Sequence, residues 1–475
     1  MQQRVPTGAF PALVVIFFFW GFVAASNDIL IPVFKQALSL TQLESQLISF
    51  AFYVAYTVGS LIYFGISAAT GRDLLHRLGY RNGLSLGLLI SAVGTLLFIP
   101  ASDNGSFPLL LAGLFTVGLG FSLQQIAANP LAIRMGDPAS ANMRLSLAGG
   151  VNNVGTTIGP VIVAFAIFGA VGAGGGTTLD LGAVKAPYLI LGSAFVLAAV
   201  FFRLSNVPDR LDSGEGTQSN TSVLATLKYP QVWLGMGAIF LYVGVEVSTA
   251  SNLPEFMRQR LGTPESAIAP FVSLFWASLM IGRWTSAAGA FNLSSSVQQR
   301  LSLLLPFVAF GLFLLVNLIA GNDVEMFYPY LFLVLVLAVA DAVSESNPVR
   351  QIVLYSALGA LSLVVGIFAD GMVSVFAFIA VGLFCSTLWP CIFTLGISGL
   401  GEHTNTASSL LIMMIMGGGV VSVAQGWLAD DAVLGIAHSY WIGVACFAYL
   451  AFFALRVNGL LKKQGISLAQ PAPGH

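Results

Sequence analysis

The chain has 475 residues, of which 57% are hydrophobic and only 8% are charged, whereas soluble globular proteins carry about 25% charged residues. This composition, with 51 Gly and 36 Phe, is typical of many membrane-spanning helices that pack through small residues. It excludes a soluble enzyme, and a net charge of -1 offers no field for nucleic acid. The three cysteines, Cys385, Cys391 and Cys446, lie in apolar runs and are interpreted as packing residues.

The first apolar run, Phe10 to Phe34, has only Arg4 before it and no small-residue cleavage site after it, so we interpret it as a retained helix. A span needs about 20 apolar residues. The weakest candidate is 326–343, because only 15 uncharged residues precede Asp341 there. The sequence predicts fourteen spans, at 10–36, 44–70, 80–101, 107–134, 143–170, 186–204, 230–257, 266–287, 300–321, 326–343, 350–369, 371–398, 404–429 and 433–456.

The positions of the basic residues test this count. If the N-terminus is cytoplasmic and all fourteen spans cross, 15 of the 19 Lys and Arg residues fall on the cytoplasmic side. That set includes Arg283, near the end of the eighth span. Only Lys35, Lys185, Arg258 and Arg260 fall outside, as the positive-inside rule requires. We therefore predict a multi-pass protein of a bacterial inner (plasma) membrane, with both termini cytoplasmic.

Short motifs of the first half recur in the second. PVF at 32–34 reappears as PEF at 254–256, an offset of 222 residues, whereas Pro130 reappears as Pro390, an offset of 260. The difference of 38 residues is about the length of a two-helix hairpin, and 300–343 has no counterpart in the first half. Each proline removes a backbone hydrogen bond and should loosen its helix.

These offsets define the predicted architecture, an all-α membrane protein of two six-helix bundles with an inserted two-helix hairpin. A polar segment separates the two bundles and is interpreted as a cytoplasmic linker. The predicted units are an N-terminal bundle at 1–204, a linker at 205–229, and a C-terminal bundle at 230–475 with the inserted pair at about 300–343.

Two carboxylates stand out inside predicted spans, where ionisable groups are costly and usually functional. Asp28 lies in WGFVAASNDILIP of the first span and Glu246 in FLYVGVEVSTASN of the seventh, which are equivalent helices of the two halves. Both are candidates for cation coupling, and Asp28 with its neighbour Asn27 for substrate binding. The alternatives are a helix-end pairing for Asp28 and a structural hydrogen bond between helices for Glu246.

Amide side chains gather in the fourth and fifth spans. Because an amide both donates and accepts hydrogen bonds, such residues suit a neutral polyol, and tryptophans such as Trp20 offer flat faces for a sugar ring. The alternatives are ordinary interhelical amide bonds and tryptophan packing. The remaining candidates for substrate binding are Gln124, Gln125, Asn129, Asn152, Trp276 and Trp389.

The sequence contains no complete and suitably placed motif of an enzyme or a metal site. GAGGG at 172–176 lacks the Lys-Ser/Thr ending of a phosphate loop. GLSLG at 83–87 matches GxSxG but lies inside an apolar span. The four histidines show no metal-ligand spacing. We therefore expect no catalysis, no metal and no cofactor.

Several stretches resemble the fucose:proton symporter family of the major facilitator superfamily, including its glucose/galactose branch. They are FFFWGFVAASNDILIP, QQIAANP, NNVG, YVGVEV and WPCIFTLGISGLGEHTNTASSLLIMMIMGGG. The resemblance implies a major facilitator fold and a cation-coupled sugar importer that works by alternating access. It also implies that Asp28 serves binding and proton coupling, and that Asn152 lies near the sugar.

The sequence departs from the family pattern at three points. Gln125 stands where fucose members carry a glutamate, Gly149 replaces a glutamine, and the inserted pair exceeds the usual twelve helices. The glutamine at 125 is similar to the glucose/galactose branch and shifts any coupling role toward Asp28 or Glu246. We therefore expect a neutral hexose such as glucose or galactose to enter with a proton or sodium ion. The chain is expected to be a monomer in the lipid bilayer, without a nucleic-acid partner.

Two other functions stay open at this point. One is a major facilitator exporter of amphipathic compounds, and the other is a non-transporting membrane sugar sensor. The amide-rich centre favours a hydroxylated solute over an amphipathic one. The sequence does not choose among hexoses or between proton and sodium.

Overall fold

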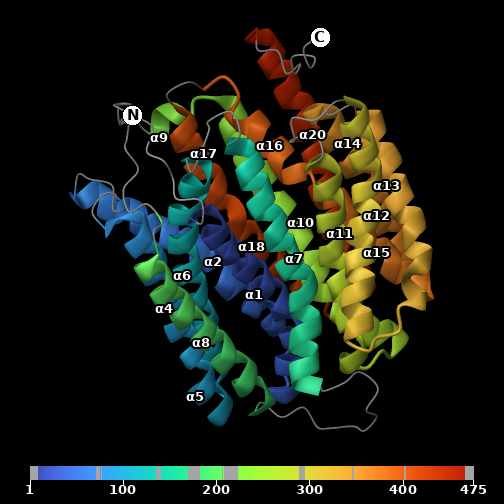
Figure 1. Ribbon diagram of the computed structural model, residues 1–475. Helices are drawn as coiled ribbons and strands as arrows, with labels where there is room; N and C mark the ends of the chain where they lie inside the picture. The colour runs from blue at the N-terminus through green and yellow to red at the C-terminus, as the bar shows by residue number, and fades with distance from the viewer. Residues whose placement is uncertain are drawn as a thin grey trace.

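The computed structural model describes residues 9–70, 75, 78–134, 141–168, 182–205, 207, 223–287, 295–344, 347–400 and 403–465. Within these ranges the chain is helical, without a strand (Figure 1). The helices of the first half are α1 (Ala9–Ala37), α2 (Gln42–Thr70), α4 (Tyr80–Leu96), α5 (Phe98–Asp103), α6 (Phe107–Arg134), α7 (Ala141–Phe168) and α8 (Gly182–Leu204).

The second half begins after the short helix α9 (Val223–Thr226). Five of its described spans are composite, because a short helix or a 3-10 turn interrupts or precedes the main helix. Its elements are α10 (Pro230–Leu261), η2 (Glu265–Ala267), α11 (Ala269–Ala287), α12 (Ser295–Ile319), η4 (Glu325–Tyr330), α13 (Leu331–Ser344), α14 (Pro348–Phe368), α15 (Gly371–Cys385), α16 (Leu388–Ile397), α17 (Thr404–Met413), η6 (Met414–Met416), α18 (Gly417–Leu428), α19 (Gly435–Ser439) and α20 (Trp441–Lys463).

Thirteen helical segments of the described residues are long and apolar enough to cross a membrane. Together with the 28-residue α7, they match the fourteen predicted spans. The weakest prediction is confirmed, because η4 and α13 form one span of 20 residues. We call the side on which α1 begins the near side and the side on which it ends the far side. With fourteen crossings, α20 ends on the near side.

The two halves repeat one packing pattern. In the first half α1 packs on α7, and α4 lies between α6 and α8; in the second half α10 packs on α18, and α14 lies between α15 and α20. The pair α12–α13 falls outside this pattern, because α12 packs on α11 and α13 on α14, at the edge of the molecule (Figure 1). The all-α fold of two six-helix bundles with an inserted hairpin is therefore confirmed.

Glycines bring the equivalent helices into backbone contact. A Cβ atom at Gly155 of α7 would lie 2.2 Å from the Phe18 carbonyl oxygen of α1. A Cβ atom at Gly417 of α18 would lie 1.9 Å from the Phe240 carbonyl oxygen of α10. Small residues are required at both positions, as expected where lipid offers no hydrophobic drive for helix association.

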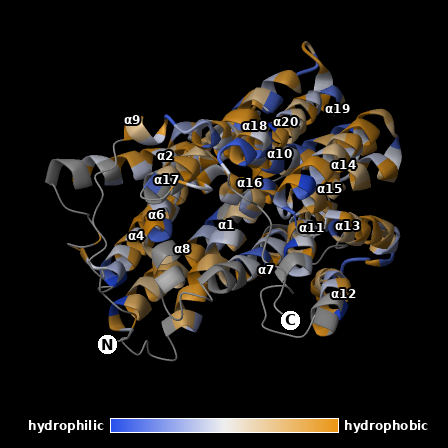
Figure 2. Cartoon of the chain, turned by 90° about the horizontal axis from the view of Figure 1, so that it is seen from above, coloured by the Kyte–Doolittle hydropathy of each residue, from blue (hydrophilic) through white to orange (hydrophobic). Residues whose placement is uncertain are grey.

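The outer faces of the helices are apolar, as the bilayer requires. On the inserted hairpin Leu304 and Leu318 are 57% and 60% exposed, and Phe332 and Val339 are 69% and 63% exposed. Hydrophobic colouring covers most outward surfaces in Figure 2, whereas hydrophilic residues gather at helix ends and near α10 and α16. These side chains suit contact with lipid tails, where the helical backbone satisfies its own polar groups.

The predicted loosening at proline occurs in the second half. At Pro390 the helix is interrupted, with α15 ending at Cys385 and α16 beginning at Leu388. Pro390 has no N–H, so the carbonyl four residues earlier, on Ser386, lacks its helical donor. At Pro130, by contrast, α6 continues to Arg134.

Candidate functional site

Asp28 lies at the contact between the two halves. It is 3% exposed, and its Oδ2 accepts a hydrogen bond of 2.8 Å from Nε1 of Trp276 on α11. None of the ion pairs among the described residues includes Asp28. A buried carboxylate with a neutral donor and no basic partner is costly in its charged form, so a bound cation would stabilise it.

Glu246 of α10 lies near the same contact. Its Oε2 accepts a hydrogen bond from the hydroxyl of Tyr242, one turn earlier on the same helix. The charges of Asp28 and Glu246 both act on Tyr53 of α2. No group of three or more His, Cys, Asp and Glu suited to a metal occurs in the described part of the chain.

The adjacent glutamines of α6 face different surroundings. Gln124 is fully buried, accepts 3.0 Å from Trp20 Nε1 and donates 3.1 Å to Ser91 Oγ. Gln125 is half-buried and donates 3.4 Å to the hydroxyl of Tyr56. The structure therefore favours the interhelical alternative for Gln124 and Trp20, whose bonds lie inside the first half, and leaves Gln125 beside the tyrosines of α2.

The other predicted amides are only partly placed. Asn152 of α7 is half-buried, and its Nδ2 donates 2.9 Å to the Phe17 carbonyl of α1. Its amide thus ties two helices of the first half. Asn27 and Asn129 lie in α1 and α6, but their side chains are outside the described residues.

The two predicted tryptophans lie on the second half. Trp276 is 4% exposed and acts as the hydrogen-bond donor to Asp28, a role that the sequence did not indicate. Trp389 of α16 is half-buried, with its ring centroid 6.1 Å from that of Tyr242 and 6.3 Å from that of Phe393. Trp276 is therefore the hydrogen-bond partner of Asp28, whereas Trp389 packs near Tyr242, the tyrosine that donates to Glu246.

The sequence did not indicate Arg283 as a site residue. It lies half-buried in α11, four residues before that helix ends. Its Nη1 donates 3.1 Å to Asn153 Oδ1 on α7, and its Nε donates 3.2 Å to the Ser386 carbonyl. The available signal was a basic residue ending the apolar run FVSLFWASLMIGRW, which is an ionisable group within a span.

A polar network joins the halves on the far side. Lys35 of α1 forms an ion pair of 2.7 Å with Glu255 of α10 and donates 2.8 Å to Gln42 of α2. Gln42 in turn donates 2.8 Å to Asn252 of α10. We call this set, with Gln46 and Ser251, the far-side latch; Ser251 Oγ donates 2.9 Å to Gln46 Oε1.

Further along α2, Thr57 donates 2.7 Å to the Met413 carbonyl of the second half. Together with the far-side latch, this closes the contact between the halves on the far side, which is the arrangement expected of one state of an alternating-access transporter.

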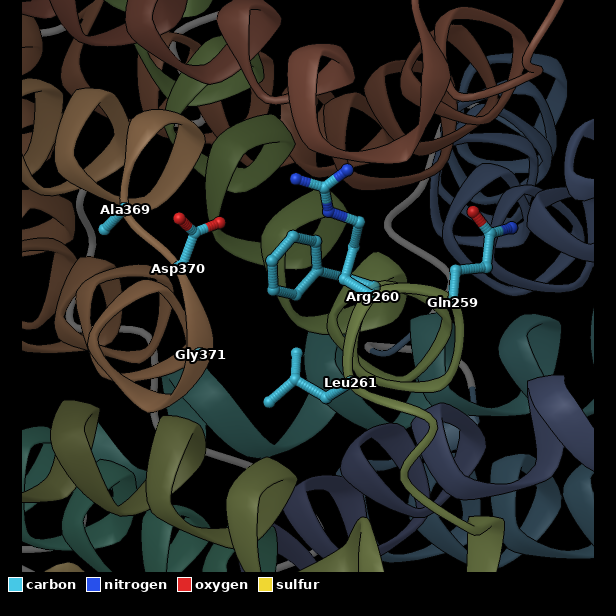
Figure 3. Close-up of a pocket in the computed structure, with 7 residues that line it drawn as sticks. Gln259, Arg260, Leu261, Ala369, Asp370 and Gly371 are labelled. Carbon is cyan, nitrogen blue, oxygen red and sulfur yellow. The ribbon is translucent and has the colours of Figure 1, made fainter.

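A separate cavity opens on the far side, with a volume of about 350 Å³. Figure 3 shows Arg260 and Asp370 on opposite sides of the hollow, with Gln259 pointing away from it. All of its lining residues belong to the second half, so this cavity does not lie between the halves and does not contain the predicted site. The lining residues are Phe256, Gln259, Arg260, Leu261, Ala369, Asp370 and Gly371.

Known proteins share this architecture. The family model described as the Major Facilitator Superfamily matches residues 10–344. The glucose/galactose transporter of Brucella abortus biovar 1 (strain 9-941) is 31% identical over 449 residues, covering 94% of this chain and 93% of its own. The L-fucose-proton symporter of Escherichia coli (strain K12) is 27% identical over 474 residues, covering 95% of this chain and 94% of its own.

Solved structures agree in fold. A crystal structure of a variant of the E. coli fucose:proton symporter has a TM-score of 0.62 at 24% identity and covers 96% of this chain and 99% of its own. A bacterial homologue of the lysosomal transporter Spinster, in an inward-facing conformation, has a TM-score of 0.59 at 13% identity and covers 100% of both chains. By family match and by identity to its relatives, the chain belongs to the Major Facilitator Superfamily and is a homologue of glucose/galactose transporters and fucose–proton symporters.

Proposed function

We propose that this protein takes up a neutral hexose, such as glucose or galactose, together with a proton or sodium ion by alternating access. The observation that carries the proposal is the buried bond between Asp28 of the first half and Trp276 of the second. A carboxylate at that contact is able to bind a cation, and its partner changes when the halves move apart. Occupancy of the carboxylate and the conformation of the protein are thereby linked.

The substrate class is supported by the names of the relatives and by the uncharged side chain of Gln125. The Brucella relative is named a glucose/galactose transporter and the E. coli relative an L-fucose-proton symporter. Gln125 is uncharged at every working pH, so it is suited to a sugar hydroxyl rather than to a cation. The coupling role then falls to Asp28 and Glu246, and the hexose is bound by Gln125, Trp276 and Trp389.

The proposed organisation is an N-terminal bundle at 1–204, a linker at 205–229 and a C-terminal bundle at 230–475, in an inner membrane with both termini cytoplasmic. The near side is then the cytoplasm. Cysteines introduced at Asp323, after α12, and at Lys462, in α20, should label from opposite sides of the membrane, because both positions are exposed and an odd number of spans separates them. Labelling of both from one side would contradict this orientation.

The decisive test is uptake of radiolabelled glucose and galactose into proteoliposomes, with inward proton and sodium gradients imposed separately. Accumulation above equilibrium with one gradient, abolished by its ionophore, is expected. Liposomes with the Asp28→Asn variant serve as the matched control. Equilibration without accumulation under either gradient would refute coupling, and no hexose movement at all would refute the substrate class.

A further inference from the structure

The inserted hairpin makes a buried polar contact with α11, the helix that carries Trp276. Tyr330 of η4 and Ser278 of α11 are both fully buried, and their hydroxyl oxygens lie 2.6 Å apart. The Ser278 hydroxyl donates its one hydrogen to the Leu274 carbonyl, 2.7 Å away, so the Tyr330 hydroxyl is the donor to Ser278. Ser278 and Trp276 are two residues apart, which places them about 200° apart around α11. The hairpin therefore holds α11 from the face opposite to Trp276.

A chain of three hydrogen-bonded residues leads from the other end of the same span to α16, the helix that carries Trp389. Oδ1 of Asp341 accepts 3.1 Å from Nε2 of Gln351 on α14 and 3.5 Å from the hydroxyl of Tyr355. Oε1 of Gln351 accepts 3.1 Å from Sγ of Cys391 on α16. Cys391 lies two residues after Trp389, and hence about 200° from it around the helix. This helix too is held from the face opposite to its tryptophan.

Asp341 sets the orientation of Gln351. A glutamine amide carries donors on its nitrogen and acceptor positions on its oxygen. With Nε2 toward the carboxylate, Oε1 faces the Cys391 thiol, whereas the reverse orientation would bring two acceptor oxygens together at Asp341. Asp341 belongs to none of the ion pairs among the described residues, although an ionisable group within a span is costly and usually functional. Orienting this amide is a function that accounts for a carboxylate at this position.

We propose that the inserted hairpin is a rear brace of the hexose site, in which Tyr330, Asp341 and Gln351 are positioning residues for the two tryptophans. Lipid tails give a hairpin no reason to bury polar contacts, because they are as apolar as its leucines. The polar contacts at the two ends of this span reach the helices of Trp276 and Trp389, in each case behind the tryptophan. Loss of a contact allows the helix to shift and weakens hexose binding. The inference rests on the proposed function, because that function places the hexose at these tryptophans.

Hexose counterflow in proteoliposomes, measured with radiolabelled glucose and galactose over a range of concentrations, separates positioning from folding. Tyr330→Phe removes only the hydroxyl, and Gln351→Met keeps the length of the side chain but removes both amide bonds. Each should raise the half-saturating concentration about threefold, and at most about seventeenfold, as expected from interhelical hydrogen bonds in membranes. The maximal rate should stay near that of wild type, whereas a loss of folded carrier would lower that rate alone.

Conservative variants supply the rescue that a positioning role requires. Asp341→Asn still offers an oxygen to Gln351, and Cys391→Ser still offers a donor, so both should keep nearly the wild-type half-saturating concentration. Asp341→Leu removes the acceptor and should match Gln351→Met. The matched control is Tyr328→Phe, which removes a hydroxyl from a tyrosine that is 50% exposed and two residues before Tyr330. This control should transport as wild type.

A double-substitution cycle tests whether the chain from Asp341 acts through Trp389. Trp389→Ala should itself weaken hexose affinity, because that ring is part of the proposed site. In that background Gln351→Met should add almost no further loss, since its effect passes through the missing ring. Tyr330→Phe acts on α11 instead and should keep its full effect in the same background.

The results distinguish the inference from the proposed function. If the wild type moves neither sugar, the proposed function fails and the inference falls with it. If the wild type transports but Tyr330→Phe and Gln351→Met keep its half-saturating concentration, only the inference is overturned. The same holds if Trp389→Ala has wild-type affinity, or if its loss and that of Gln351→Met multiply. If Gln351→Met is not recovered as a monodisperse protein, Asp341→Leu decides in its place, and wild-type affinity of that variant overturns the inference.

Discussion

The two carboxylates of the equivalent helices α1 and α10 differ in the origin of their partners. Asp28 of α1 accepts its hydrogen bond from Trp276, which belongs to the opposite half. Glu246 of α10 accepts its bond from Tyr242, four residues earlier on the same helix. In the proposed alternating-access cycle the first bond would break and re-form as the halves move, whereas the second would move as part of one helix. The proposal therefore gives two carboxylates at related places in a repeat different relations to the conformational cycle.

The largest effect should come from removing the cross-half carboxylate. Asp28→Asn keeps the size of the side chain and still accepts from Trp276, but it no longer binds a cation. We expect sugar accumulation to be abolished while binding and counterflow persist, as measured with radiolabelled hexose in proteoliposomes. A correctly inserted Asp28→Asn variant that concentrates sugar at the wild-type level would show that Asp28 is structural and would remove the basis of the comparison.

The second-largest effect tests whether it matters that the hydrogen-bond donor to Asp28 lies on the opposite half. Trp276→Phe keeps an aromatic ring but removes the donor to Asp28, and a hydrogen bond to a charged group contributes about 1.5–3 kcal/mol. Since about 1.4 kcal/mol is one decade, the far-closed conformation should become roughly ten- to a hundredfold less favoured. A cysteine at Ser248, which is fully buried below the far-side latch, should then react faster with a far-side reagent.

The matched variant is Tyr242→Phe, which removes the donor to Glu246. Because that bond lies within one helix, both conformations lose it equally, and the labelling rate at position 248 should change less than twofold. Equal acceleration in the two variants would mean that the location of the partner does not matter.

The fold was predictable because a bilayer restricts the chain to few solutions. Lipid forces every spanning backbone to satisfy its own hydrogen bonds, so apolar length alone located the spans, and the offset change of the repeat located α12–α13. Charges inside apolar runs are rare, which is why Asp28 and Glu246 stood out. These features depend on local sequence and on the surrounding lipid.

The partners were not predictable, because they depend on which helix faces which. Gln124 and Gln125 are adjacent in sequence but about 100° apart around α6, and only the packing shows that the first serves Trp20 and Ser91. Trp276 was proposed as a flat face for a sugar, whereas the structure uses its N–H. Arg283 was counted only as a cytoplasmic charge near the end of the eighth span, because its acceptor on Ser386 depends on how α11 packs against the proline break.

The adjacent glutamines Gln124 and Gln125 should differ in which property their substitution changes, although each effect should be smaller than those above. Gln125→Ala should weaken apparent sugar affinity about tenfold, because one sugar hydrogen bond contributes about 0.5–1.5 kcal/mol and more if its partner stays buried. Gln124→Ala should leave affinity unchanged but lower thermal stability, because two buried bonds within the first half are lost. The measurements are uptake against sugar concentration and the loss of monodisperse protein on heating. The reverse pattern would exchange the roles assigned to the two residues.

The smallest effect applies the same comparison to one carboxylate with two basic partners. Glu255 pairs with Lys35 of the opposite half at 2.7 Å and with Arg258 of its own helix at 2.6 Å. Partly exposed ion pairs contribute about 0.2–1 kcal/mol, so Lys35→Gln should open the far-side latch only a few-fold. Arg258→Gln removes a pair of similar length, yet that pair lies within α10 and does not distinguish the two conformations.

Far-side labelling of the cysteine at position 248 measures both variants under identical conditions. We expect Lys35→Gln to raise the labelling rate about two- to fivefold and Arg258→Gln to leave it unchanged. Added salt should reduce the difference, because Lys35 remains 15% exposed and its attraction to Glu255 is partly screened. If Arg258→Gln raised the labelling rate as much as Lys35→Gln, the far-side latch would depend only on the total charge around Glu255. Whether a partner lies on the opposite half or on the same helix would then make no difference at Glu255, whose two ion pairs are nearly equal in length.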